Sequence, residues 1–285
     1  MTNSHTYENP VAQLLFIKEP TAWNDRWIDY PTEFGLTKAD IPDLIRLSCD
    51  EEPLDCESID YFIHALRALA QLDPEAALTL YLELLQKFPD DDFLHEEIYG
   101  LSREVGAIAI APLVKLMSGV TQDRWVQTTA ANGLESIAQA HPECREACVQ
   151  AIVEQLRNYR NQDDGTLNTT LVDKLIQLEV VEEAALLAEV FENCEIDEFL
   201  TGSWPAAQVK FGLKKESDFS PEELIAKEPD YIKLIREQRK QDIDRDVIAV
   251  IGQISALRRP AGKGFGSVSS GKKGKKKKKK KDGDF

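Results

Sequence analysis

The sequence predicts an all-α protein, an α-solenoid of stacked helical hairpins with a disordered, basic C-terminal tail. The first observation is internal repetition, because ALRALAQLDPE at 65–75 returns as GLESIAQAHPE at 133–143 and aligns Leu66 with Leu134. The second is an intermediate copy at 93–117, which aligns Leu69 with Leu101. A hairpin of about 34 residues cannot bury its apolar face alone, so repeated copies must stack on one another.

The chain begins with a lead-in to this stack, residues 1–36. Its first ten residues show no apolar periodicity. Bulky rings follow at Trp23, Trp27, Tyr30 and Phe34. Since a terminal repeat must close the open end of a stack, we interpret this cluster as an N-terminal aromatic cap.

The repeat region is expected at residues 37–213. A short helix at 41–47 leads to a first full hairpin at 58–88, whose two helices meet at Asp73-Pro74, because proline is accepted in the first turn of a helix. The remaining hairpins are expected at 92–105 with 107–117, 122–140 with 143–159, and 166–178 with 182–193. These hairpins exceed the minimum of about three repeats that stacking requires.

Residues 214–260 are expected to form a linker and an amphipathic helix. The helix carries a narrow apolar stripe at Ile243, Val247, Val250, Ile254 and Leu257. Such a stripe is normally buried, either on the same chain or on a second molecule. Residues 261–285 are rich in lysine and glycine, a low-complexity composition that predicts a disordered tail.

Charge is divided unevenly along the chain. The formal net charge is −16, but residues 1–260 carry −24 and residues 261–285 carry +8. The acidic part should repel nucleic acid and anionic membranes, so any polyanion binding is expected in the tail. The candidate residues are Lys272, Lys273, Lys275, Lys276, Lys277, Lys278, Lys279, Lys280 and Lys281.

The cysteines form no dense framework, and an odd number, five, in a long chain is typical of a reducing compartment. The apolar run at 11–17 is too short and too interrupted for a signal peptide, and no segment is long enough to span a membrane. We therefore expect a cytoplasmic protein without membrane contact.

The start WIDYPTEFGLTKADIPDLIRL, the repeats, and the ending IDEFLTGSWPAAQVKFGL at 196–213 together resemble a group of uncharacterised bacterial HEAT-like repeat proteins. The repeats also resemble the HEAT-like repeats of phycobilisome lyases. The resemblance implies the solenoid fold, and Trp204 is expected to close its C-terminal end. SSGKKGKK in the tail resembles the small zinc motif of SecA-type tails. The ligand positions of that motif would fall on Gly266, Val268, Lys277 and Lys278, so this copy is degenerate and cannot bind zinc.

No enzymatic motif is visible. The sequence contains no G-x-G-x-x-G, Walker A or G-x-S-x-G pattern, so we expect neither an enzyme nor a cofactor. His141, Cys144 and Cys148 have the helical spacing of zinc ligands, but no fourth ligand accompanies them, which favours a place in the core. The aspartates at 90–92 lack the alternating spacing of a calcium loop and are expected to cap a helix. No metal is expected.

A candidate partner-binding site lies near the start of the helix expected at 122–140. Trp125 is about 125° around that helix from its apolar face, on a polar side. A tryptophan on a polar face can anchor a partner in the groove of a solenoid, and the candidate residues are Arg124, Trp125, Thr129 and Asn132. The alternative is that neighbouring hairpins cover the ring, since a solenoid helix packs on two sides.

These observations favour a non-enzymatic scaffold or adaptor that binds a protein partner along the groove of the solenoid. The resemblance to phycobilisome-lyase repeats leaves a second hypothesis open, a bilin lyase or chaperone. A third is a polyanion-binding adaptor that makes weak, non-specific contacts through the lysine tail. The sequence leaves open the identity of the partner and the oligomeric state.

Overall fold

The computed structural model describes residues 7–17, 26–50, 60–119, 123–161, 165–227 and 232–240. These residues form helices and turns and no strand, so the protein is all-α, as the sequence predicts. The chain divides into two units, Met1–Pro229 and Asp230–Phe285. The described part of the second unit is a helix at 232–240. The apolar stripe expected at 243–257 and the lysine tail lie outside the described residues.

The elements of the first unit follow one another with short connections. Its α-helices are α1 (Tyr30–Phe34), α2 (Ile41–Ser48), α3 (Tyr61–Leu72), α4 (Pro74–Lys87), α5 (Asp92–Val105), α6 (Ile110–Met117), α7 (Arg124–Ala140), α8 (Arg145–Arg157), α9 (Gly165–Gln177), α10 (Ala184–Asn193), α11 (Glu198–Thr201), α12 (Trp204–Lys210) and α13 (Pro221–Leu224). Its 3-10 turns are η1 (Val11–Phe16), η2 (Lys38–Asp40), η3 (Gly106–Ala109), η4 (Pro142–Cys144), η5 (Tyr159–Asn161), η6 (Val181–Glu183) and η7 (Glu216–Asp218).

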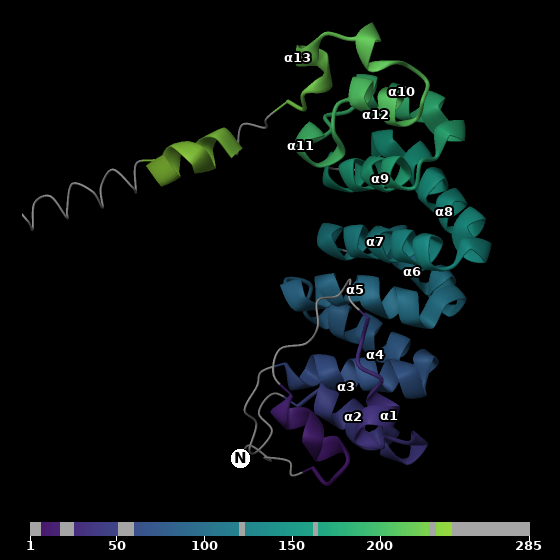
Figure 1. The fold of residues 1–285 in the computed structure, drawn as a ribbon, viewed down its shortest axis with the longest axis vertical. Helices are drawn as coiled ribbons and strands as arrows, with labels where there is room; N and C mark the ends of the chain where they lie inside the picture. The colour runs from purple at the N-terminus through teal and green to yellow at the C-terminus, as the bar shows by residue number, and fades with distance from the viewer. Residues whose placement is uncertain are drawn as a thin grey trace, which may run out of the picture. The chain divides into compact units, whose positions relative to one another are not determined.

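Four helices form a row in which each one contacts the next: α3, α5, α7 and α9. The helices between them in the sequence pack on this first row, because α4 contacts α3 and α5, α6 contacts α7, and α8 contacts α7 and α9. Figure 1 shows the first-row helices one above another in chain order. The candidate site described below lies on this first row.

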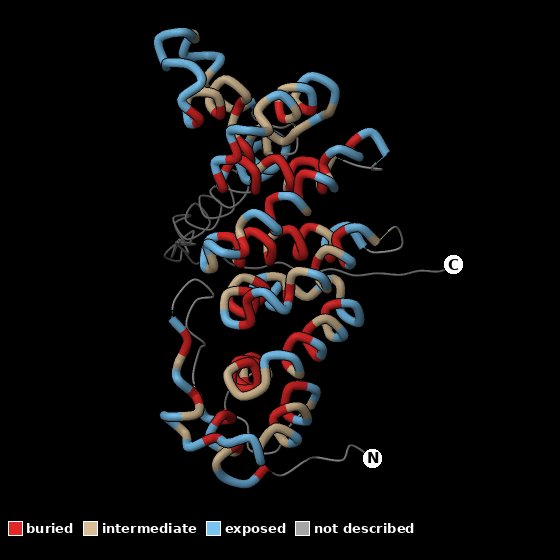
Figure 2. Tube along the Cα trace, turned by 90° about the vertical axis from the view of Figure 1, so that its right-hand side faces the viewer, coloured by how far each residue is buried: buried red, intermediate tan, exposed pale blue. Residues whose placement is uncertain are grey.

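Buried apolar residues occupy equivalent positions in successive hairpins. Leu66 and Leu69 of α3 are buried. The residues that the repeat aligns with them, Leu134 of α7 and Leu101 of α5, are buried as well. Figure 2 shows that buried stretches alternate with exposed ones along the helices of the first unit. Burial of one such side chain stabilises the fold by about 1.5–3 kcal/mol, which offsets the entropy lost on ordering.

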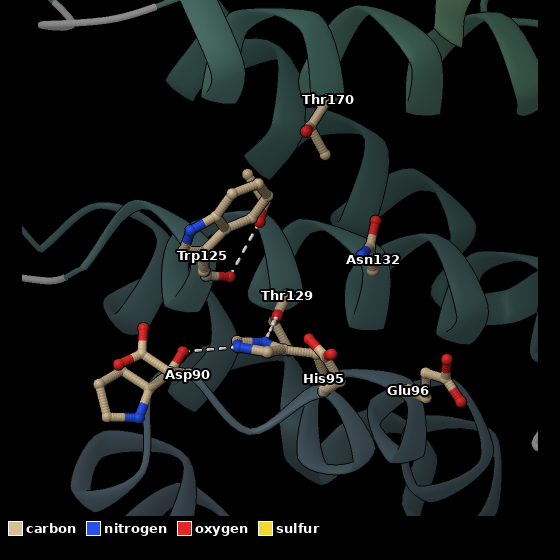
Figure 3. A pocket seen from close by; sticks show the side chains of 10 residues that line it. Asp90, His95, Glu96, Trp125, Thr129, Asn132 and Thr170 are labelled. Atoms are coloured by element: carbon tan, nitrogen blue, oxygen red, sulfur yellow. Dashed lines mark hydrogen bonds between the residues drawn. The ribbon is translucent and has the colours of Figure 1, made fainter. Parts of the chain in front are cut away.

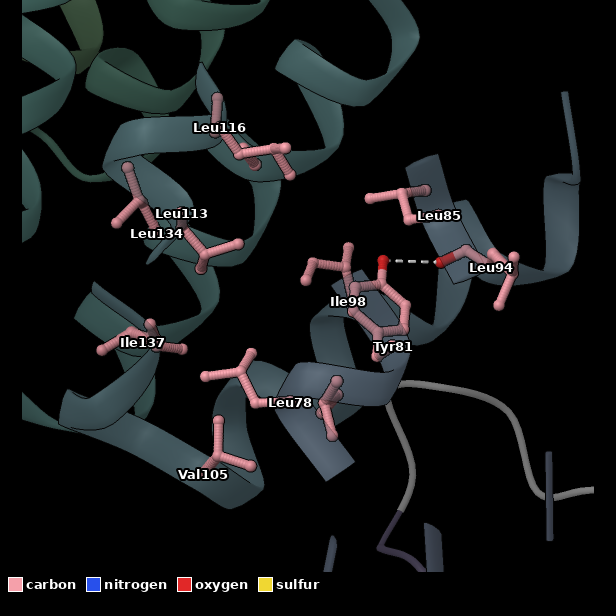
Figure 4. Packing of buried hydrophobic residues seen from close by; sticks show 14 of the residues in the cluster. Leu78, Tyr81, Leu85, Leu94, Ile98, Val105, Leu113, Leu116, Leu134 and Ile137 are labelled. Atoms are coloured by element: carbon pink, nitrogen blue, oxygen red, sulfur yellow. Dashed lines mark hydrogen bonds between the residues drawn. The ribbon is translucent and has the colours of Figure 1, made fainter. Parts of the chain in front are cut away.

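The hairpins also meet through larger side chains, as the close view of α4 and α5 shows (Figure 4). Tyr81 of α4 is completely buried, and its hydroxyl donates a hydrogen bond to the Leu94 carbonyl of α5 at 2.9 Å. A buried hydroxyl needs such a partner, because an unsatisfied one costs about 1–3 kcal/mol. The bond therefore fixes the register between α4 and the start of α5.

The helix ends follow local chemistry. Asp73 caps α4 by accepting a hydrogen bond from the Ala76 N–H at 3.1 Å, and the aspartates at 90–92 supply the cap of α5 through Asp91. Gly106 ends α5 with a φ of 63°, a conformation that favours glycine. The helix expected at 107–117 begins instead as the 3-10 turn η3, because the tight reversal after α5 is continued by short-range hydrogen bonds.

Residues 26–30, called the strap below, lie against α3; residues 26–29 are not helical, and Tyr30 begins α1. The Gln71 side chain binds the strap backbone at two points: its nitrogen donates to the Ile28 carbonyl and its oxygen accepts from the Tyr30 N–H, both at 2.9 Å. The Tyr30 ring is completely buried, and its hydroxyl lies 2.7 Å from Nδ1 of His64. The strap is therefore held by both its backbone and its side chains.

Trp27 of the strap is buried against α5 and α3. A methyl group on Gly100 of α5 would lie 2.5 Å from the indole, so only glycine leaves room for the ring. On the α3 side, the Arg67 guanidinium carbon lies 4.9 Å from the ring centroid. Arg67 is itself buried and donates two hydrogen bonds to Glu97 of α5, that from Nε at 2.8 Å. Of the expected cap residues, Trp23 lies outside the described part of the chain.

Trp204 packs among the last helices of the first unit. Its ring centroid lies 5.6 Å from that of Phe191 in α10 and 6.5 Å from that of Phe211. Gly202, with a φ of 75°, makes the bend that precedes α12. Trp204 therefore has a packing role in the described structure.

Candidate functional site

A pocket lined mainly by polar and charged residues lies beside the first turns of α5 and α7 and the side of α9 (Figure 3). Its volume is about 570 Å³. The lining residues come from the α4–α5 loop and from three helices of the first row: Pro89, Asp90, Asp92, His95, Glu96, Trp125, Thr128, Thr129, Asn132 and Thr170. The pocket therefore depends on how consecutive hairpins pack.

Trp125 is placed by the start of α7. The Asp123 carboxylate accepts a hydrogen bond from the Trp125 N–H at 2.7 Å and caps the helix. One turn on, the Thr128 hydroxyl donates to the Trp125 carbonyl at 2.8 Å. The side chain itself is 49% exposed. The neighbouring hairpins therefore do not cover the ring completely.

His95 joins α5 to α7 beside the pocket. Its Nε2 lies 2.7 Å from the Pro89 carbonyl and its Nδ1 lies 2.5 Å from the Thr129 hydroxyl. Because a carbonyl only accepts, we assign the proton of the neutral ring to Nε2, and Nδ1 then accepts from Thr129. Both ring nitrogens are engaged, so His95 can act on a ligand only by breaking one of these bonds.

The α9 side of the pocket is fixed by buried charges one turn beyond Thr170. The Lys174 ammonium lies 2.9 Å from Glu135 of α7 and 3.0 Å from Asp173. Burial alone would lower the pKa of Lys174, but the two carboxylates raise this pKa well above its ordinary value. Lys174 therefore stays charged at neutral pH and ties α9 to α7 at the pocket.

The pocket carries negative charge. Asp90, Asp92 and Glu96 supply carboxylates, and no lysine or arginine is among the described residues that line it. Within the described ranges, no residue forms a hydrogen bond or ion pair with the Glu96 carboxylate or the Asn132 amide. These groups are available to a ligand, and their charge favours a cationic one.

Three of the four predicted partner-binding residues meet at this pocket: Trp125, Thr129 and Asn132. Thr129 is almost completely buried, so it contributes mainly by holding His95. Arg124 does not line the pocket. Its guanidinium carbon lies 5.6 Å from the centroid of the Trp125 ring, within range of a cation–π contact.

The contributions of His95, Glu96 and Thr170 were not predicted from the sequence. One signal was present, since the repeat alignment places His64, Glu96 and Asn132 in the same register. Two of these three residues line the pocket. Comparing one register position across all copies would have identified Glu96, whereas His95 and Thr170 carry no such signal.

The residues with zinc-ligand spacing, His141, Cys144 and Cys148, have structural contacts. Within the described ranges, no group of three or more His, Cys, Asp or Glu side chains could hold a metal ion. Cys144 and Cys148 are buried, and burial, with a smaller contribution from Cys144, raises the pKa of Cys148 to about 11. His141 bonds the Arg103 carbonyl through Nε2 at 2.8 Å. The lysines at 272–281 lie outside the described residues.

Comparison with protein-family models gave no match, and comparisons with curated proteins and with solved structures gave no significant match. The resemblances to HEAT-like repeat proteins and to SecA-type tails therefore stay predictions. Among the residues that the structure describes, no helix combines the length and the apolar character needed to cross a membrane.

Proposed function

We propose that the protein is a non-enzymatic adaptor that binds a protein partner through the pocket around Trp125. In this proposal residues 37–213 form an α-solenoid of HEAT-like hairpins. The contacts of α3, α5, α7 and α9 in chain order and the shared register of their buried leucines support the solenoid.

The observation that carries the proposal is the half-exposed indole of Trp125 beside a polar pocket. Tryptophan is among the residues that most often dominate binding energy, because it combines a large apolar area with a polar N–H. Apolar area that a partner covers contributes about 25 cal/mol per Å². The exposed ring can therefore supply affinity for a partner, and the carboxylates and the amide around it can orient that partner.

The same geometry supports a role without catalysis. Thr129 and His95 form a hydrogen-bonded pair of the kind that could activate a nucleophile. The Thr129 residue, however, is only 2% exposed, and the second nitrogen of His95 is held by Pro89. Because a substrate cannot reach the Thr129 hydroxyl, the hydrogen bond between Thr129 and His95 supports a structural role for these two residues.

Substitution of Trp125 tests the proposal. We expect Trp125→Ala to weaken a partner captured from a lysate at least tenfold, while the melting temperature changes by no more than about 2 °C. Phe199→Ala is the matched control, because Phe199 is 56% exposed and does not line the pocket. Equal binding by wild type and Trp125→Ala would contradict the proposal, and so would equal losses in both variants.

A further inference from the structure

The strap shows how the first row of helices binds the backbone of a segment that is mostly not helical. Gln71 of α3 satisfies one carbonyl and one N–H of the strap backbone, and His64 bonds the hydroxyl of Tyr30. Between these contacts and Gly100, the Trp27 ring is buried. This face of α3 is thus occupied by a piece of the chain itself, bound through its backbone and its side chains.

The pocket continues this face on the next first-row helices. Glu96 of α5 and Asn132 of α7 occupy the register of His64 when the repeats are aligned on their buried leucines. His64 meets the strap, whereas Glu96 and Asn132 line the pocket and bond no described residue. Asn132 has the same amide group as Gln71, so it can donate to one backbone carbonyl and accept from one N–H.

We infer that the partner enters the pocket as an extended segment carrying a lysine or arginine side chain. The inference rests on the proposed function and names the chemistry of its partner. Asp90, Asp92 and Glu96 attract a cation, and no lysine or arginine is among the described residues that line the pocket. The net charge of −24 on residues 1–260 adds long-range attraction for a basic segment and repels an acidic or phosphorylated one.

The test uses the full chain and dodecapeptides displayed on phage. Peptides that are retained by wild type and lost with Trp125→Leu are synthesised with a fluorescein label, and their dissociation constants are measured by anisotropy. Two variants then separate a local charge effect from a general one. Glu96→Gln and Glu104→Gln each remove one exposed carboxylate from α5, but only Glu96 lines the pocket.

We expect the retained peptides to contain lysine or arginine. Their dissociation constants should rise at least threefold with Glu96→Gln and at least tenfold with Trp125→Leu, and should not change with Glu104→Gln. Equal effects of the two glutamate substitutions would overturn the inference, because they would show only general charge attraction.

Two outcomes of this experiment separate the basic segment from the adaptor function itself. Retained peptides without a basic residue whose binding still depends on Trp125 would overturn the inference and leave the proposed adaptor function intact. Absence of any peptide that depends on Trp125 would overturn the inference and count against the pocket as a binding site altogether.

Discussion

Arg67 of α3 and Glu97 of α5 form an ion pair in which both side chains are almost completely buried. Two hydrogen bonds join them, so each charge replaces part of the water that the other has lost. A buried charge that loses its partner is costly, whereas removing both charges together is often neutral. The pair therefore makes α3 and α5 depend on each other.

This dependence gives a prediction for the free energy of unfolding. Glu97→Ala should lower it by about 3–5 kcal/mol, because the Arg67 guanidinium then stays buried without its carboxylate. The double substitution Arg67→Met with Glu97→Leu should recover most of that loss. Urea unfolding of both variants measures the difference. A double variant as unstable as the single one would contradict the pairing.

Tyr30 predicts how stability depends on alkaline pH. Burial, the largest cause, raises the pKa of Tyr30 to about 12, while Arg67 lowers it and Glu97 raises it further. The unfolded chain releases this proton near pH 10, whereas the folded chain keeps it. The stabilisation is thus fully present below about pH 10 and is lost as pH rises toward 12.

The measurement compares wild type with Tyr30→Phe. Between pH 9 and pH 11, wild type should lose roughly 1 kcal/mol more of its free energy of unfolding than the variant, which has no phenol to titrate. Urea unfolding at the two pH values gives both losses. Equal losses would show that the Tyr30 phenol does not contribute to the alkaline slope.

Single residues also show what the sequence could predict about the site. The place of Trp125 on a polar side of its helix follows from its angle on that helix, and in the structure the side chain is 49% exposed. The neighbours of that ring come from α5 and α9, so their approach depends on packing between hairpins. Periodicity within one helix contains no information about that packing, which is why His95 and Thr170 were missed.

At the scale of elements, helix ends were predictable because they depend on residues a few positions apart. Asp73-Pro74 starts α4, Asp91 caps α5, and Gly106 ends α5. The strap was not predictable in the same way. Its contacts with Gln71 join residues 41 and 43 positions apart, and an isolated glutamine in an apolar helix gives no sign of its partner.

The stacking of elements gives a further prediction. Leu134 is completely buried in α7, which contacts α5, α6, α8 and α9. Leu134→Asp should place an uncompensated charge in the core, cost several kcal/mol and unfold the central hairpins. Ala140→Asp, at an exposed position of the same helix, is the control and should cost no more than about 1 kcal/mol. A far-ultraviolet melt of Leu134→Asp that matches wild type would contradict the register of α7.

At the scale of the whole molecule, the division of charge sets a limit on nucleic-acid binding. The lysines at 272–281 could each neutralise a phosphate, and every neutralised phosphate makes binding more sensitive to salt. The acidic residues of the same chain compete for these lysines at the high effective concentration of an intramolecular contact. Lysine acts as a point charge and reads no sequence.

We therefore predict weak binding of nucleic acid by the full chain at low salt and none near physiological salt. The isolated peptide 261–285 should bind more tightly than the full chain, with little difference between poly(U), mixed RNA and duplex DNA. Fluorescence anisotropy of labelled oligonucleotides across a salt series measures all of these. Tighter binding by the full chain, or a strong sequence preference, would mean that the acidic part supplies contacts of its own.

Binding of a partner at Trp125 can be measured most directly through the nuclear magnetic resonance signals of the indole N–H groups. The chain has four tryptophans, so a nitrogen-15 spectrum of the full chain contains four indole signals, which single substitutions to phenylalanine assign. During addition of the captured partner, we predict that the Trp125 signal shifts or broadens in proportion to occupancy. The signals of Trp27 and Trp204, which pack within the described structure, should stay in place. Saturating binding that leaves the Trp125 signal unchanged would contradict the claim.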